Sequence, residues 1–443
     1  MRPALSVLLS LALLAAAAWP WETLQAQEAA TAQDADADAA AVPTEAAPPS
    51  RVPLEEIQRY VAVYNAIRQG YVDPVDDHKL MQSAVRGLLL DLDPHSAYLD
   101  KDDAESFNEQ TSGAYDGIGV ELLQQQDGSL RVIAPIDDTP AARAGIRAGD
   151  IITAIDGKPL SALDGMRMLH GNPGTRVVLT IEREGQAKPF DVTLSRETIR
   201  VTSVRSKMLE PGYGYVRIST FQADTGPDFA TQLGKLQAQA GGKLRGLVLD
   251  LRSNPGGLLS AAVQVADDLL DAGTIVSTRG RIPISDAVFK ASPGDLMNGA
   301  PVVVLVDAGS ASASEVLAGA LHDNGRARVV GSRTFGKGSV QTLLPLGNGD
   351  SVKLTTARYY TPSGKSIQAS GIVPDVALSP DAPAGSDEGL AEYSEAALPG
   401  HLRGDDEGAE GYSAGSALPG DKPITQALGE LERIASSTDE TVN

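Results

Sequence analysis

The residues best suited to a catalytic site lie in Asp307–Glu315, a run of small residues and serines. This run joins an apolar strand to a predicted helix. A serine on such a strand-to-helix turn, here Ser312, presents its hydroxyl at the sheet edge. The following N–H, that of Ala313, can face a developing oxyanion. The alternative role is helix capping, which Ser310 or Ser314 could also serve. The stretch by itself leaves both roles open.

A nucleophilic serine needs a base, and none of the five histidines has the setting of a Ser-His-Asp triad. His322 lies near the end of the same helix as Ser312, and His401 lies in an acidic tail. A lysine remains, because Lys337 lies between Gly336 and Gly338. Lysine has a pKa of about 10.4 in water, and burial can lower it enough to accept a serine proton.

The same loop nearly matches a phosphate-binding pattern, since Gly331–Gly338 resembles GxxxxGK[ST]. Position 338 is Gly, so the hydroxyl that would hold magnesium is missing. The segment that follows, Val340–Pro345, reads as a strand and not as the helix that would cradle phosphate. We therefore reject a nucleotide site.

The predicted secondary structure changes along the chain. Pro53 is predicted as the first residue of one helix, and a second covers His78–Leu92. Short alternating strands follow, with Val177, Leu179 and Ile181 on one face and a hairpin at Asp156-Gly157. From Tyr213 strands and helices alternate, and apolar strands such as Val302–Val306 predict parallel pairs covered by helices.

Both ends of the chain differ in composition and charge from the region between them. Residues 1–26 include an apolar run of 15 residues, which is shorter than the roughly 20 residues that a helix needs to span a bilayer. The run therefore predicts a secretory signal peptide. Residues 27–50 have a charge of −5 and residues 381–443 a charge of −11, out of a total of −21. Such acidic, apolar-poor segments favour disorder, apart from one short helix predicted at Ile424–Ile434. The overall charge argues against nonspecific binding of nucleic acid.

Taken together, the motifs resemble the C-terminal processing peptidases, the carboxyl-terminal Ser-Lys proteases of family S41. The similarity covers about Leu54–Asp375. It rests on Asp93-Pro94-His95-Ser96, Tyr115-Asp116-Gly117-Ile118-Gly119-Val120, Leu249-Asp250-Leu251-Arg252, Asn254-Pro255-Gly256-Gly257, Gly309-Ser310-Ala311-Ser312-Ala313-Ser314-Glu315, Gly336-Lys337-Gly338 and Thr361-Pro362-Ser363-Gly364.

The resemblance implies roles for individual residues. Ser312 matches the family nucleophile, Lys337 the general base and Gln341 a residue that positions the lysine, with its amide oxygen able to accept from the lysine nitrogen. Asp323 matches an acidic residue also implicated in the family, although a helix C-terminal turn is the favoured role here. The oxyanion hole should pair Ala313 N–H with an N–H from Gly256 or Gly257, for which a tight turn is the alternative.

The strand-rich insert resembles a PDZ domain, through Gly117, Ile118, Gly119 and Val120 and the later stretch Ala141–Asp150. Such a domain binds a protein tail as an added strand and holds its terminal carboxylate on backbone N–H groups. In relatives the insert also switches the active site between aligned and misaligned states. Arg183 is a candidate participant in that switch, and a surface charge on a strand is the favoured alternative.

The implied fold is multidomain α/β, with a protease core of mixed and parallel sheet of the ClpP/crotonase type. The divisions are a signal peptide (1–26), a disordered acidic linker (27–50), an N-terminal helical module (51–113), an inserted PDZ domain (114–197), a Ser-Lys protease core (198–380) and an acidic low-complexity tail (381–443).

The expected activity is that of an exported serine endopeptidase, periplasmic in a bacterium with two membranes and membrane-associated if the signal stays uncleaved. Expected partners are protein substrates with exposed C-termini. The resemblance adds a homodimer through the N-terminal helices and, as in some relatives, a lipoprotein adaptor. No metal or cofactor is expected, since no ligand spacing is present. The alternative is a non-catalytic PDZ scaffold with a vestigial protease core.

Overall fold

The computed structural model describes residues 52–125, 128–136, 138–160, 168–379, 394–405, 407 and 415–441. The predicted signal peptide and linker, residues 1–50, lie outside these ranges. Within them, no helix is both long enough and apolar enough to cross a bilayer. The chain divides into two compact units, Met1–Pro74 and Val75–Asn443.

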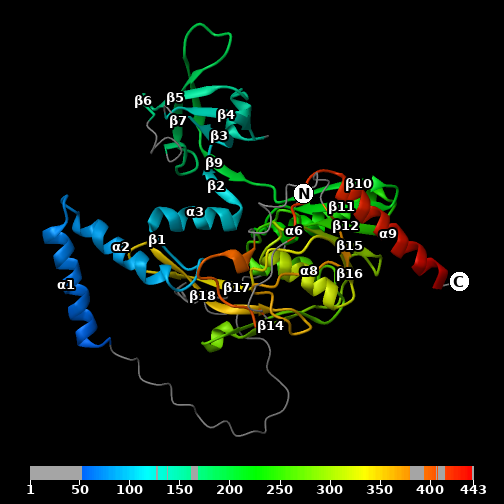
Figure 1. Ribbon diagram of the computed structural model, residues 1–443. Helices are drawn as coiled ribbons and strands as arrows, with labels where there is room; N and C mark the ends of the chain where they lie inside the picture. The colour runs from blue at the N-terminus through cyan, green and yellow to red at the C-terminus, as the bar shows by residue number, and fades with distance from the viewer. Residues whose placement is uncertain are drawn as a thin grey trace, which may run out of the picture. The chain divides into compact units, whose positions relative to one another are not determined.

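The first unit has one helix among its described residues, α1 (Leu54–Gly70), coloured blue in Figure 1. Pro53 stands at the N-cap, one residue before the predicted position. The apolar side chains recur at helical spacing, but none in the helix is buried, and Leu54 is 67% exposed. Since packing supplies most of the stability of a helix, α1 gains little within its own unit.

The second unit begins with α2 (Asp77–Leu90), which covers most of the predicted helix. Asp76 caps it by accepting from Lys79 N–H. A short strand, β1 (Ala97–Leu99), leads to α3 (Lys101–Ser112), which ends at Gly113 in a left-handed conformation.

The strand-rich insert is an antiparallel sheet in the order β3-β4-β5-β7-β8, with β6 paired to β5. The predicted inward face is confirmed, because Val177, Leu179 and Ile181 are fully buried. Asp156 and Gly157 both have positive φ and join β5 to β6 as a tight hairpin. The elements are β2 (Ala114–Gly117), β3 (Val120–Gln124), β4 (Leu130–Pro135), α4 (Pro140–Arg143), β5 (Ile151–Ile155), β6 (Lys158–Pro159), β7 (Arg176–Glu182), β8 (Phe190–Ser195) and β9 (Glu197–Arg200), which pairs with β2.

The central sheet has the order β10-β11-β12-β15-β16-β19. Only the pair β10–β11 is antiparallel, so the predicted parallel sheet is present from β11 onward. Its strands are β10 (Val204–Glu210), β11 (Tyr213–Ile218), β12 (Gly246–Asp250), β15 (Val302–Val306), β16 (Ala327–Gly331) and β19 (Val376–Ala377).

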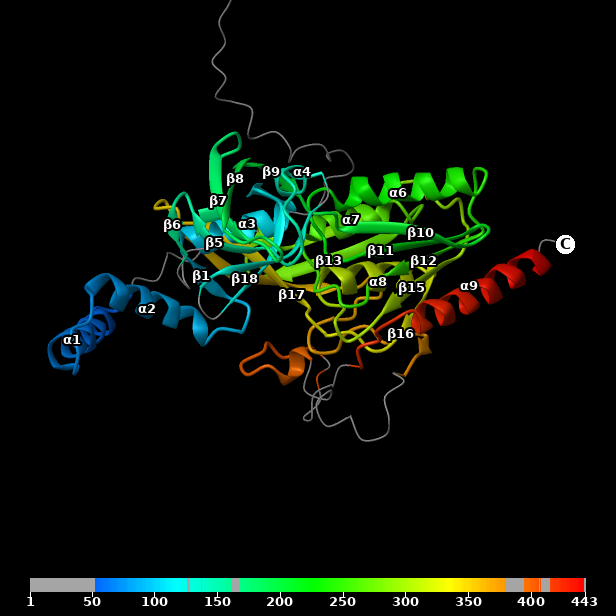
Figure 2. The same ribbon diagram turned by 90° about the horizontal axis from the view of Figure 1, so that it is seen from above.

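Helices cover both faces of this sheet, as Figures 1 and 2 show. Along β15, Val302 and Val304 pack with α6 (Thr225–Gln239), α7 (Leu259–Asp267) and α8 (Ala313–Asp323). Val303 and Leu305 pack instead with the C-terminal helix α9 (Lys422–Thr441). Because successive residues of a strand point to opposite faces, both faces must be apolar, which explains the uninterrupted run Val302–Val306.

A second, antiparallel sheet lies beside the loop that carries Lys337. Its strands run in the order β1-β18-β13-β14, and β17 also pairs with β18. The new strands are β13 (Thr274–Gly280), β14 (Ala287–Lys290), β17 (Ser339–Pro345) and β18 (Ser351–Tyr360), with a 3-10 turn η1 at Pro283–Ser285.

The C-terminal region is more ordered than its composition suggests. Helix α9 is longer than the predicted Ile424–Ile434 and buries Ile424, Ala427 and Leu431 against the sheet. A few apolar residues at helical spacing are enough to bury one face while the acidic residues stay outside. A second piece, the 3-10 turn η3 (Glu395–Ala397), also packs into the unit, with Glu395 fully buried. The expectation of disorder is therefore wrong for residues 394–405 and 415–441.

Candidate active site

The turn between β15 and α8 holds Ser312 in an unusual backbone conformation. Its φ is 55° and its ψ is −114°, outside the regions that side-chain-bearing residues normally occupy. Strain of this kind costs about 1–3 kcal/mol and is concentrated at functional sites. Ser312 directly precedes the first residue of α8 and is 8% exposed. The predicted strand-to-helix turn is thus present, with a strained serine at its end.

The two neighbouring serines have structural roles instead. Ser310 Oγ donates to the carbonyl of Leu251 at 2.8 Å, and Ser314 Oγ donates to the carbonyl of Asn254 at 2.9 Å. Both serines are fully buried, and both bonds tie the turn to the loop that follows β12. Ser312 itself forms a capping box with Glu315 at the start of α8, so the predicted capping role is also present at this serine.

The loop after β12 brings Gly256 against the serine. A Cβ built on Gly256 would lie 2.9 Å from Ser312 Cβ and 3.0 Å from Ala313 N, which is closer than real side chains pack. Gly256 also has a φ of 101°, a value that favours glycine. The backbone of this loop therefore approaches Ser312 as only glycine allows.

The predicted oxyanion donors differ in their availability. Gly256 N–H donates to Asn254 Oδ1 at 2.9 Å, so it is already engaged. Among the described residues, nothing accepts from Ala313 N–H or from Gly257 N–H. Ala313 N–H also begins helix α8, where the helix dipole favours negative charge. Ala313 and Gly257 are thus the better-suited pair.

One buried carboxylate, that of Glu315, joins the serine turn to the lysine loop. Its Oε2 accepts from Ser312 N–H at 2.7 Å and from Lys337 N–H at 2.9 Å. Its Oε1 accepts from Gly336 N–H at 2.7 Å and from the hydroxyl of Thr334 at 2.5 Å. Since each nitrogen is a single hydrogen bond from the same oxygen, Ser312 N and Lys337 N are within about 6 Å of each other.

The environment of Glu315 shifts its pKa strongly. The side chain is completely buried, and this desolvation raises the pKa of Glu315 to about 7. Its hydrogen bonds from Thr334, Gly336, Ser312 and Lys337 act in the opposite direction, because they favour the ionised carboxylate.

Burial also changes the acidity of Lys337. Desolvation lowers the pKa of its ammonium group, and the nearby charge of Lys353 lowers it further. The carboxylates of Glu395, Glu315 and Asp93 raise it by a smaller amount, so the pKa of Lys337 lies below its usual value. In the described part of the chain, no oxygen accepts from Lys337 Nζ. Such a lysine can give up its proton more easily than one in water.

Gln341 and Asp323 lie in different parts of the molecule. Gln341 is in β17, near the lysine loop, and its amide nitrogen donates to Ser339 Oγ and Thr355 Oγ1 at 3.0 and 3.2 Å. Asp323 is the last residue of α8, about 16 Å along the helix from Ser312. It accepts from Ser363 N–H at 3.0 Å. Burial raises the pKa of Asp323, but hydrogen bonds, chiefly from Thr361 and Ser363, outweigh it and hold the pKa below its usual value.

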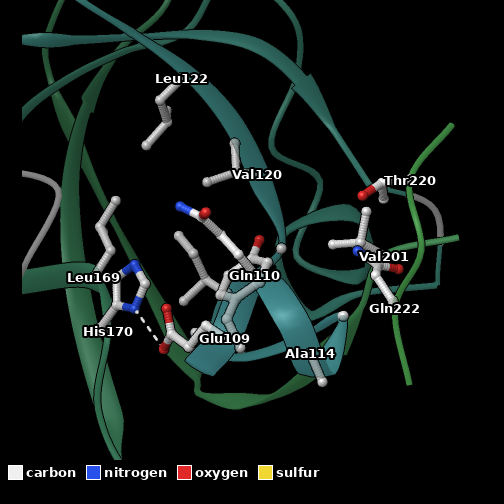
Figure 3. A pocket seen from close by; sticks show the side chains of 15 residues that line it. Glu109, Gln110, Ala114, Val120, Leu122, Leu169, His170, Val201, Thr220 and Gln222 are labelled. Atoms are coloured by element: carbon white, nitrogen blue, oxygen red, sulfur yellow. Dashed lines mark hydrogen bonds and ion pairs between the residues drawn. The ribbon is translucent and has the colours of Figure 1, made fainter. Parts of the chain in front are cut away.

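A pocket of about 460 Å³ adjoins the predicted peptide-binding loop (Figure 3). Strand β3, which follows Gly117–Gly119, is at the sheet edge and can accept another strand. At one side of the pocket, His170 Nδ1 lies 3.4 Å from Glu109 Oε1 of α3. The lining includes Ile118, Val120, Leu122, Leu169, Val201, Thr220 and Gln222.

Arg183 follows β7 and is held within the insert. Its guanidinium donates to both carboxylate oxygens of Asp150, at 2.6 and 2.7 Å, and to the carbonyl of Gly145 at 2.9 Å. Asp150 is buried, and although burial raises its pKa, the hydrogen bonds from Arg183 outweigh this and hold the pKa below its usual value.

Comparisons with known proteins identify the family of this chain. A model of peptidase family S41 matches residues 212–378, a PDZ domain model matches 117–194, and the model of the activating protease CtpB N-terminal domain matches 12–103. The carboxy-terminal-processing protease of Bartonella bacilliformis is 42% identical over 390 residues, covering 86% of this chain and 88% of the relative. The chain belongs to peptidase family S41. It is a carboxy-terminal processing protease with a PDZ domain, and a serine-type peptidase.

Two further relatives of this S41 peptidase are more distant. The carboxy-terminal processing protease CtpA of Bacillus subtilis is 34% identical over 317 residues, which is 71% of this chain and 67% of the relative. Among solved structures, the photosystem II D1 C-terminal processing protease is 32% identical, with a TM-score of 0.42, covering 74% of this chain and 94% of that one. The predicted family, the multidomain α/β fold and the enzyme class are confirmed.

Two residues of this S41 peptidase that the structure brings to the site, Glu315 and Glu395, were not predicted from the sequence. Glu315 was visible as a glutamate three residues after Ser312, the spacing of a capping box, in which the glutamate side chain accepts from the N-cap N–H. Glu395 gave no such signal, because it lies in an acidic stretch. Among the described residues, no group of three or more histidine, aspartate or glutamate side chains could hold a metal ion.

Proposed function

We propose that this S41 peptidase is an exported endopeptidase that recognises unstructured protein C-termini through its PDZ domain and cleaves near them through Ser312 and Lys337. One observation carries the catalytic part: a single oxygen of Glu315 accepts from the backbone N–H of both residues. These two bonds hold the backbone of a strained serine near that of a partly buried lysine whose pKa is lowered. Both features support a Ser-Lys mechanism, in which Lys337 Nζ must come within hydrogen-bond reach of Ser312 Oγ.

The proposed reaction has two halves. The neutral amine of Lys337 takes the proton of Ser312 Oγ, and Oγ bonds to the carbonyl carbon of the scissile peptide. The negative charge on the carbonyl oxygen is stabilised by the N–H groups of Ala313 and Gly257. The Lys337 ammonium then gives its proton to the leaving nitrogen, the C–N bond breaks, and an acyl-enzyme remains.

Deacylation repeats these transfers with water. Lys337 takes a proton from a water molecule whose oxygen bonds to the ester carbon. When the bond from that carbon to Ser312 Oγ breaks, the proton returns to Oγ and the new C-terminus leaves. We assign Gln341 to orienting Lys337 through its amide oxygen, since its amide nitrogen is held by Ser339 and Thr355. Asp323, at the far end of α8, takes no part.

The PDZ insert supplies the proposed selection of substrates. A protein tail would add to the free edge of β3 and place its carboxylate on the N–H groups of Gly117–Val120, with apolar contacts in the adjoining pocket. A tail must be unstructured to lie as a strand. The pocket also includes Thr220, whose hydroxyl donates to the carbonyl of Gly256, so the groove borders the loop next to Ser312.

Cleavage of unfolded casein tests the catalytic proposal. Wild-type protein should cleave, whereas Ser312→Ala and Lys337→Ala should each lose at least about 10³-fold in kcat/KM while still binding a C-terminal peptide. Lys235→Ala, which removes an exposed lysine on α6, is the control and should cleave normally. Full activity of Lys337→Ala would require another base. Peptide binding without any cleavage by wild type would favour the non-catalytic scaffold.

Export and assembly are the remaining parts of the proposal. Residues 1–26 support export on their apolar length and small-residue end, and N-terminal sequencing of the mature protein after fractionation tests it. The exposed apolar face of α1 supports a homodimer. Light scattering of wild type and of a Leu54→Ser, Ile57→Ser variant tests this. A lipoprotein adaptor stays a prediction from the family resemblance.

A further inference from the structure

The loop that carries Lys337 also makes a second set of contacts, with residues that follow β18. Gly338 N–H donates to Gln368 Oε1 at 3.0 Å, and Gly336 O accepts from Ala369 N–H at 2.8 Å. A Cβ on Gly338 would lie 2.2 Å from Gln368 N, so the two segments are in direct backbone contact. The loop is therefore hydrogen-bonded both to the Glu315 carboxylate and to the segment Gln368–Ala369.

Glu395 completes this second set. Its N–H donates to the carbonyl of Phe335 at 3.0 Å, at the start of the lysine loop. Its carboxylate accepts from the amide nitrogen of Gln368 at 2.9 Å. The same amide nitrogen donates to the carbonyl of Leu402, farther along the C-terminal segment. Glu395 thus contacts the loop directly and also holds Gln368, which binds the other end of the loop.

A third segment meets Glu395 from the N-terminal part of the unit. His95 Nε2 lies 2.8 Å from Glu395 Oε2, across 300 positions of sequence. Asp93 fixes the turn that carries His95, because its Oδ1 accepts from His95 N–H at 2.8 Å. Glu395 is completely buried, and burial of a carboxylate is tolerated only with hydrogen-bond partners such as these. Through these contacts Glu395 joins three segments of the unit at the loop that carries Lys337.

We propose that Glu395 is a positioning residue for Lys337, which fixes the loop of the base and supplies negative charge beside it. This inference rests on the proposed function, since it assumes that Lys337 is the base. It gives a role to part of the acidic C-terminal region: the turn η3 is a piece of the active-site framework, supplied from beyond the family S41 match at 212–378.

The negative charge of Glu395 should affect the pKa of Lys337 and therefore the pH dependence of activity, which the loss of a purely structural contact would not shift. The charged groups that act on Lys337 are Lys353 on β18, which lowers its pKa, and Glu395, Glu315 and Asp93, which raise it. His95 faces Glu395 as well. Replacing Glu395 by glutamine removes one raising influence at almost unchanged shape. The pKa of Lys337 should then fall, and more of the lysine should be neutral at a given pH.

The experiment compares pH profiles of kcat/KM for wild type and Glu395→Gln, with casein peptides as substrate. The acid limb should move to lower pH by about 0.5 unit or more. Glu395→Ala, which also removes the contacts to Gln368 and His95, should lower kcat by about tenfold or more with little change in KM. Glu407→Gln is the matched control: Glu407 pairs with His401 in the same C-terminal region, at 2.9 Å, and among the described residues its carboxylate has no hydrogen bond to the lysine loop.

The results separate this inference from the proposed function. An acid limb that stays in place or moves to higher pH in Glu395→Gln overturns the role of Glu395, as does an equal shift in Glu407→Gln. If Glu395→Ala fails to fold, as judged by circular dichroism, the profile of Glu395→Gln still decides. Full activity of Lys337→Ala would instead overturn the proposed function, whatever the profiles show.

Discussion

Ser312 and Lys337 are joined through their backbones, not through their side chains. The two N–H groups donate to the same oxygen of Glu315, at 2.7 and 2.9 Å. A serine at a helix N-cap and a lysine on a separate loop are thus hydrogen-bonded to the same carboxylate oxygen. Because misplacement by about 1 Å can cost 100-fold in rate, a shared anchor of this kind sets the geometry on which the proposed proton transfer depends.

Glu315→Gln should disconnect the two segments. A glutamine side chain has one acceptor oxygen, and its NH2 group cannot accept from the donors that Glu315 now binds. Two buried N–H or hydroxyl groups would lose their acceptor, so we expect kcat to fall about 100-fold or more and the free energy of unfolding to fall by about 2 kcal/mol or more. Casein cleavage and urea unfolding measure these effects.

The control for this change is Glu184→Gln, at an exposed position of the insert. It should alter neither quantity. If Glu315→Gln kept wild-type kcat, the shared carboxylate would have no part in catalysis.

Lys353→Met should change the pH dependence in the opposite direction to Glu395→Gln. Lys353 lowers the pKa of Lys337, so its removal raises that pKa. The neutral amine of Lys337, the proposed base, then forms only at higher pH, and the acid limb of kcat/KM should move upward by about 0.5 unit. Methionine keeps the length of the side chain and its contact with Phe107. Lys290→Met, at an exposed end of β14, is the control. A downward shift would contradict the assigned charge effect.

Much of the fold could be predicted from local patterns. The run Val302–Val306 indicated a strand buried on both faces, and the structure has it between α8 and α9. The residue types of Ser312 and Lys337 pointed to the same chemistry that their surroundings support. Such features depend on side-chain periodicity and on the chemistry of single residues, which a sequence displays directly.

The supporting contacts could not be predicted in the same way. Glu395 binds His95, 300 positions away, and its acidic neighbours gave the segment the composition of a disordered tail. Gly256 N–H was an equal candidate for the oxyanion hole until the structure placed Asn254 Oδ1 against it. In each case the outcome depends on which distant backbone groups meet, and local composition carries no signal for that.

Gly256→Ala should damage the site without unfolding the protein. The added methyl group would lie 2.9 Å from Ser312 Cβ, so the serine or the loop must move. We expect kcat/KM to fall about 100-fold or more. Gly294→Ala is the matched control, because Gly294 also has a positive φ, of 142°, but has open space where a Cβ would stand. Comparable activity of the two variants would show that the approach of Gly256 to Ser312 is unimportant.

Asp268→Asn should make the protein more stable at neutral pH. Asp268 follows α7, and burial together with the charge of Asp267 raises its pKa to about 6. Its Oδ2 is buried and has no hydrogen-bond partner among the described residues. A carboxyl group with a raised pKa stabilises the fold below its unfolded pKa of about 3.9, and this contribution is lost as pH rises through about 6.

The asparagine variant carries no charge at any pH, so its advantage over wild type should be small at pH 4.5 and reach about 1–2 kcal/mol by pH 7.5. Urea unfolding across this range measures the difference, and Asp91→Asn, at an exposed position after α2, should track wild type throughout. If the stability difference between Asp268→Asn and wild type did not grow with pH, the charge of Asp268 would not be destabilising the fold. Because Asp268 lies outside the catalytic framework, kcat should stay at the wild-type value while stability changes, which separates this effect from the one expected for Glu315.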